Sequence, residues 1–222
     1  MLKSWSHSFS AALLACAAAA MAVAEPGPAS RPASLEIIVK FTPASDAGRR
    51  ILATLDKDPQ DLSGLRALQR ELEQSTGFVL VPVRITSGRE LLVSIPEAPA
   101  LEKVRQSVNK RPQISSASLI ALQEQNPRLA QSMLLVRFRP GSAESELLDK
   151  ARADDTRAAA VQALAADLGA DSGVPLLGST RADGALALEL DRQALLRELV
   201  ARLQSLPDVA YAQANAGVQI MN

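Results

Sequence analysis

The side chains that most often perform chemistry are almost absent from this chain. Its 222 residues include one His, one Cys and one Trp, and these are His7, Cys16 and Trp5, all close to the amino terminus. Beyond them no imidazole can serve as a general base, which excludes a Ser-His-Asp or Cys-His arrangement. Without imidazole or thiolate ligands, no ordinary zinc site can form there. We therefore predict no enzymatic activity, no cofactor and no metal site.

The first 24 residues have the features of a targeting segment. Lys3 gives a positive start, and the apolar stretch 9–24 ends in the small-residue triplet Ala22-Val23-Ala24. This pattern predicts a secretory signal peptide over 1–24, hence export to the periplasm or the extracellular space, with no membrane span in the mature form. Two alternatives stay open. One is a single membrane anchor, which the short apolar run disfavours; the other is a lipid anchor at Cys16, because Leu13-Leu14-Ala15-Cys16 is similar to a lipobox.

The overall composition excludes some classes of partner. Hydrophobic residues make up 47% and charged residues 22%, as in ordinary globular proteins. The chain has 24 basic and 24 acidic residues, so no net charge attracts it to nucleic acid. Aromatic residues, at 3%, are too few for base-stacking platforms. We expect no nucleic-acid partner.

The chain repeats itself. Three landmarks recur in the same order at offsets of 97, 96 and 95: 37–43 with 134–140, Ser87-Gly88 with Asp183-Gly184, and 111–114 with 206–209. We predict two homologous domains, 34–120 and 133–222. The segment between them, 121–132, is polar and contains Asn126-Pro127, so it is interpreted as a linker.

Both halves show the same order of elements. Alternating β-rich stretches predict strands, and apolar residues at helical spacing predict helices. In the first half we expect strands at 35–41, 78–85, 90–95 and 114–120, and helices at 62–74 and 99–109. In the second we expect strands at 134–138, 174–179, 185–190 and 209–214, and helices at 154–168 and 192–205. The predicted class is α+β, as two tandem ferredoxin-like βαββαβ sandwiches, each an antiparallel sheet with two helices on one face.

The second half resembles the propeptide domain of subtilisin-like serine proteases, a domain also found as free-standing proteinase inhibitors. The similarity rests on the opening strand 134–138, the glycines Gly173 and Gly184, and the closing run 203–211 (LQSLPDVAY). In that family a helix and a short Pro turn likewise precede a Val-x-Tyr strand. The first half is similar more weakly, through 37–41, 112–114, Gly77 and Gly88, and it has Ser116 in place of Tyr211.

The resemblance implies a binding mode. The open sheet face of the family packs on two surface helices of the protease, and the tail after the last strand occupies the substrate cleft like a bound product. Acidic residues after the Tyr often cap those helices, whereas here Gln213 and Asn215 carry no charge. The implied helix contacts are Tyr211, Gln213 and Asn215, and the implied tail is Ala216, Gly217, Val218, Gln219, Ile220, Met221 and Asn222.

We therefore expect an exported, non-enzymatic inhibitor of a secreted subtilisin-like serine protease, with the second domain active. The first domain would be a degenerate copy, a second inhibitory site or a spacer. Either Asn222 or Met221 would enter the first specificity pocket. One alternative is a chaperone that acts in trans on the folding of such a protease. Another is a periplasmic ligand-binding or structural module, which predicts a pocket between the two domains.

Overall fold

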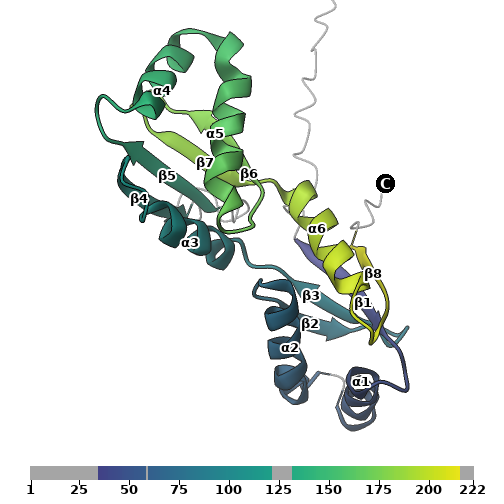
Figure 1. Ribbon diagram of the computed structural model, residues 1–222. Coiled ribbons are helices and arrows are strands. Elements are labelled where there is room, and N and C mark those ends of the chain that lie inside the picture. Colours follow the sequence, from purple (N-terminus) through teal and green to yellow (C-terminus); the bar gives the residue numbers. More distant parts are fainter. Residues whose placement is uncertain (1–34, 59, 122–131, 216–222) are drawn as a thin grey trace, which may run out of the picture. The chain divides into compact units, whose positions relative to one another are not determined.

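The computed structural model describes residues 35–58, 60–121 and 132–215 (Figure 1). The predicted signal peptide, the tail 216–222 and most of the predicted linker lie outside these residues. Within them the fold is α+β, as predicted, with six α-helices and two four-stranded antiparallel sheets.

The two halves have the same order of elements, as the repeat predicts. The first half contains β1 (Glu36–Phe41), α1 (Asp46–Lys57), α2 (Arg66–Thr76), β2 (Val81–Ile85), β3 (Leu91–Ser94), α3 (Glu97–Val108) and β4 (Ile114–Ala121). The second contains β5 (Ser132–Phe138), α4 (Ala143–Ala153), α5 (Ala158–Ala170), β6 (Leu176–Thr180), β7 (Leu186–Leu190), α6 (Arg192–Gln204) and β8 (Val209–Ala214). Short 3-10 helices at Leu62–Leu65 and Asp155–Arg157 lead into α2 and α5.

The two halves exchange their last strands. One sheet has the strand order β2-β3-β1-β8 and the other β4-β5-β7-β6. The expectation that each half closes its own sheet is therefore wrong, because β4 completes the sheet of the second half and β8 that of the first. The preceding helices move with their strands: α6 contacts β8 and β1, while α3 contacts β4, β5 and β7.

The exchange divides the described chain into two lobes that cut across the repeats. Lobe A consists of residues 35–95 and 191–215, and lobe B consists of residues 97–190. Lobe B is thus continuous in sequence and inserted between β3 and α6 of lobe A. Its two ends meet, since Glu97 forms an ion pair with Arg192. An insertion whose ends lie together leaves the host lobe free to close its own sheet.

The hairpin between β4 and β5 gives a physical reason for the exchange. The two strands pair antiparallel from Ile114 opposite Phe138 to Ala121 opposite Ser132, and only residues 122–131 separate them. Pairing with this near neighbour costs less loop entropy than a return to β1 across the whole first half. The place beside β1 is then taken by β8, from Ala214 opposite Ile37 to Val209 opposite Phe41.

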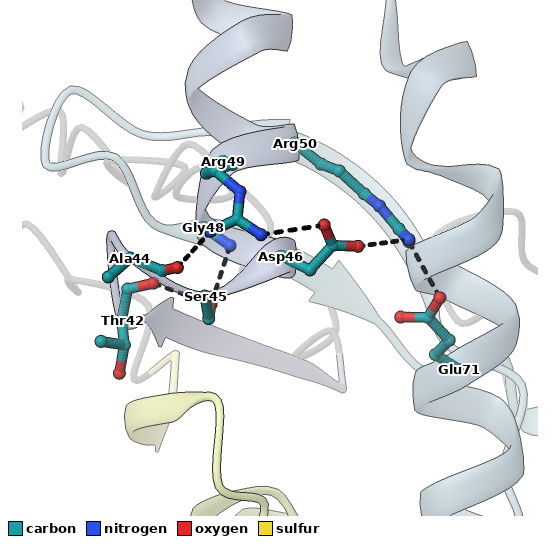
Figure 2. Close-up of polar contacts among 8 residues, drawn as sticks. All are labelled: Thr42, Ala44, Ser45, Asp46, Gly48, Arg49, Arg50 and Glu71. Atoms are coloured by element: carbon teal, nitrogen blue, oxygen red, sulfur yellow. Dashed lines mark hydrogen bonds and ion pairs between the residues drawn. The ribbon is translucent and has the colours of Figure 1, made fainter.

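The sequence patterns did not predict α1 and α4, which precede α2 and α5. Helix α1 begins at a Ser45 cap, whose hydroxyl oxygen accepts a hydrogen bond from the Gly48 N–H at 3.0 Å and donates one to the Thr42 carbonyl at 2.7 Å (Figure 2). Helix α4 begins in the same way at Ser142, which accepts from the Ser145 N–H. Such caps satisfy the free N–H groups of a first turn.

Ion pairs then hold α1 against α2. Arg50 lies between Asp46, at 2.5 Å on its own helix, and Glu71 of α2, at 2.9 Å (Figure 2). All three side chains are substantially exposed, so the pairs orient the helices more than they stabilise them. The extra helix in each half therefore belongs to the outside of its lobe.

Each sheet buries one face against its helices. In lobe A the inward residues of β1 pack with leucines of α6 that come from the other half; this core includes Ile37, Val39, Phe41, Leu195, Leu199 and Leu203. In lobe B the inward residues of β5 pack with α3, and the core includes Leu134, Val136, Phe138, Leu101, Val104 and Val108. Each half thus completes the hydrophobic core of the other, and the second face of each sheet is left outside these cores.

Candidate partner-binding face

The outward side of the lobe A sheet gathers residues from both halves of the chain. Ile37 and Val39 point into the core, so strand alternation turns Glu36, Ile38 and Lys40 to the other side. The strand pairing then defines three rows across this side. We call it face A, and its residues are Glu36, Ile38, Lys40, Val81, Arg84, Thr86, Glu90, Leu92, Ser94, Tyr211, Gln213 and Asn215.

The first row ties β8 to the turn between β2 and β3. Tyr211 donates its phenol hydrogen to Glu90 Oε1, and the Thr86 hydroxyl donates to Glu90 Oε2 at 2.7 Å. Between them, Lys40 lies opposite Tyr211 and donates to the Gly88 carbonyl. The hydrogen bond from Tyr211, then that from Thr86, lowers the pKa of Glu90, while Glu90 raises the pKa of Tyr211. A second-half tyrosine is thus anchored by a first-half carboxylate.

The row at the opposite end fixes the residue that precedes the predicted tail. The Asn215 backbone N–H donates to the Glu36 carbonyl at 2.9 Å, and its side-chain Nδ2 donates to Glu36 Oε2 at 2.7 Å. The other carboxylate oxygen, Oε1, has no hydrogen-bond donor among residues 35–58, 60–121 and 132–215. Face A therefore carries a carboxylate held by one oxygen and free at the other within the described structure.

The middle row is apolar at its centre and polar at its ends. Ile38 lies opposite both Leu92 of β3 and Gln213 of β8, and Leu92 lies opposite Arg84 of β2. Arg84 is exposed and forms no ion pair within the part of the chain that the structure describes. An apolar centre with a polar rim is the usual anatomy of a protein–protein interface.

The structure brings the three predicted contact residues together. Tyr211, Gln213 and Asn215 alternate along β8 and its end, so all three lie on face A. The predicted tail residues 216–222 lie outside the described residues. The surroundings of the three residues differ from expectation, because β8 lies beside β1 and not beside β5.

Sequence analysis missed the first-half residues of face A, above all Glu36, Ile38 and Glu90. No pattern within the first half reveals that β8 becomes the neighbour of β1. A signal was nevertheless present in the short spacing between β4 and β5, which suits a hairpin. The interpretation of 121–132 as a linker between domains concealed that signal.

The equivalent face of lobe B has diverged. At the positions of Tyr211, Gln213 and Asn215, strand β4 has Ser116, Ser118 and Ile120. The position of Glu36 is taken by Met133, and that of Val81 by Leu177. Ile120 and Leu177 are 37% and 47% exposed. The polar outer row of face A is therefore largely apolar in lobe B, and the tyrosine anchor is absent from it.

A cavity of about 470 Å³ lies where the chain passes from lobe B to α6. Its charged lining is engaged in holding the backbone. Glu97 pairs with Arg192 and accepts from the Ser132 N–H at 3.1 Å, and Asp191 caps α6 by accepting from the Ala194 N–H. These contacts give the charged groups structural roles.

Within the described residues, no group of three or more His, Cys, Asp or Glu side chains is arranged to hold a metal ion. None of the described helices has the length and apolar character needed to cross a membrane. Comparison with known proteins found no matching family model, no matching curated protein and no matching solved structure.

Proposed function

We propose that this protein is an exported inhibitor of subtilisin-like serine proteases, which docks through face A and places residues 216–222 in the substrate cleft. The observation that carries the proposal is the position of Tyr211, Gln213 and Asn215. They share one helix-free sheet face and immediately precede the tail.

The chemistry of the tail suits a protease cleft. Seven extended residues reach about 23 Å, and alternate side chains point to opposite sides. Such a segment can add as a strand to the edges of a cleft, with backbone hydrogen bonds supplying affinity and side-chain pockets supplying specificity. The two hydrogen bonds from Asn215 to Glu36 give this segment a fixed starting point.

Glu36 supplies the charge that Gln213 and Asn215 lack. A carboxylate near a helix N-terminus is favourable by about 0.3–1 kcal/mol, because it meets free N–H groups and the positive end of the dipole. Glu36 Oε1 is available for such a contact within the described structure, whereas both oxygens of Glu90 already accept hydrogen bonds from Tyr211 and Thr86. We assign Glu36 as the residue that meets a protease helix.

We further propose that each lobe is a ferredoxin-like sandwich whose closing helix and strand come from the other half. In repeat terms, both sheets have the order fourth, first, third and second strand, with the fourth strand exchanged. This is the arrangement expected for a split β-α-β unit, apart from the exchange and the extra helices α1 and α4.

Inhibition of a purified subtilisin-type protease tests the proposed function. We would compare residues 25–222 with a version that ends after Asn215 and with one whose last seven residues are replaced by Gly and Ser. Both altered chains are expected to inhibit at least about 100-fold more weakly, because the strand-addition contacts are lost. Equal inhibition by all three would contradict tail insertion.

The failure of all three chains against several such proteases would contradict the inhibitor proposal itself. A chain that fails to inhibit durably but speeds the refolding of a denatured protease would instead favour the chaperone alternative.

A further inference from the structure

We infer that the chain has a single recognition face for its protease partner, built jointly by the two repeats, and that first-half residues Ile38, Leu92 and Arg84 contact that partner. This inference rests on the proposed function and specifies the binding surface. It replaces the expectation that the second half carries inhibition alone.

The strand exchange is the first observation behind it. Tyr211 and Gln213 lie opposite Lys40 and Ile38 of β1, and the next strand in the sheet is β3 with Leu92. A partner that covers the outward side chains of β8 and approaches the centre of the sheet must therefore meet Ile38 and Leu92. None of these first-half neighbours would be present in an isolated second half.

The two lobe faces provide the second observation. Ile38 has its structural equivalent in Leu135 of β5, and Arg84 has its equivalent in Ser179 of β6. Around Leu135 the neighbours are Ser118 and Ala187, without the carboxylate, the tyrosine anchor or the strand that precedes the tail. The lobe B face therefore lacks each polar feature that fits a protease helix terminus.

The occupant is argued from charge and from the reach of the chain. Face A offers the Glu36 carboxylate at one end and the Arg84 guanidinium in its middle row, which suits a surface of helix termini and polar side chains. The tail leaves β8 at the end of the sheet that holds Glu36, so it continues from the same contact.

The test uses the full chain, with matched variants in the two lobes. Ile38→Lys and Arg84→Glu alter face A, while Leu135→Lys and Ser179→Glu make the same changes at the equivalent positions of lobe B. We would measure the inhibition constant of each variant, the protease:inhibitor ratio by titration, and folding by thermal melting. Arg84→Glu keeps the test informative if Ile38→Lys unfolds, because Arg84 is an exposed rim residue.

We expect one protease per chain and at least about 30-fold weaker inhibition for the two face A variants, the effect typical of a central interface residue. The lobe B variants should inhibit as the unaltered chain does. Two proteases per chain, or normal inhibition by well-folded Ile38→Lys and Arg84→Glu, would overturn the inference. Absence of inhibition by the unaltered chain would instead overturn the proposed function.

Discussion

At the scale of single residues, the hydrogen bond between Tyr211 and Glu90 links the two halves of the chain. Sequence analysis selected Tyr211, Gln213 and Asn215 because strand alternation places them on one face, and that part of the site was predictable. Glu90 was not, because its role depends on a strand that lies far away in sequence. The cost or gain of such a contact is visible only once the sheets are known.

Replacing Tyr211 by Phe should raise the pKa of Glu90 towards its ordinary value. The Tyr211 hydrogen bond is the largest cause of the lowered pKa, and Thr86 maintains only part of it. Carboxyl titration by NMR checks this. Glu102, whose pKa is lowered to about 2 by Arg105 and Gln106, provides an internal reference that should not move. An unchanged Glu90 would show that the Tyr211 contact is absent in solution.

The same pair has a consequence for stability against pH. Because folding lowers the pKa of Glu90, the carboxylate stabilises the fold at pH values above its unfolded pKa, and this contribution is lost as the pH falls through its folded pKa. Tyr211→Phe should therefore be less stable than the unaltered chain at neutral pH, with the difference shrinking in acid. Denaturant unfolding at several pH values measures it, and a difference that grows in acid would contradict the assignment.

Gly48 tests how closely α1 approaches the end of β1. An added Cβ would lie 2.2 Å from the Thr42 carbonyl oxygen, so Gly48→Ala must displace backbone. Overpacking of this kind costs about 1–3 kcal/mol. Gly64→Ala is the control, because its nearest atom would be Thr54 Oγ1 at an ordinary 3.5 Å. Equal unfolding free energies for the two variants would contradict the close packing.

At the scale of elements, the strands and the predicted helices follow from period-2 and helical patterns, and the structure places all of them near the expected residues. Helices α1 and α4 escaped because their apolar faces are narrow: Leu148 is the only fully buried residue of α4 among those described. Their caps at Ser45 and Ser142 were the available signal. Elements that contribute little to a core leave little periodicity in the sequence.

The edge strand β6 owes its outer hydrogen bonds to a side chain. Gln162 of α5 donates to the Gly178 carbonyl at 2.7 Å and accepts from the Gly178 N–H at 3.2 Å. Gln162→Ala should lower the unfolding free energy by about 1–2 kcal/mol and speed hydrogen exchange at Gly178. Gln69→Ala removes only a same-helix contact to Glu73, so it should cost about 0.5 kcal/mol or less. Comparable losses would show that the strand edge does not need Gln162.

At the scale of the whole molecule, the repeat was visible in the sequence but the exchange was not. Strands β4 and β8 have equivalent patterns, so either could complete either sheet, and alternation alone cannot choose. The choice depends on loop closure: β4 has β5 as a hairpin neighbour, and the ends of lobe B meet at Glu97 and Arg192. These are properties of connections, which local residue patterns record poorly.

The most direct test of the exchange is a pair of engineered disulfides in the chain from Glu25 onward, which contains no other cysteine. Ile38 lies opposite Gln213 in the structure, whereas its partner in a self-closed first half would be Ser118, the equivalent residue of β4. Directly opposed strand residues are close enough for a disulfide. We predict that Ile38→Cys with Gln213→Cys forms an intramolecular bond on mild oxidation and that Ile38→Cys with Ser118→Cys does not. The reverse result would show that each half closes its own sheet, and it would contradict the composite face on which the account depends.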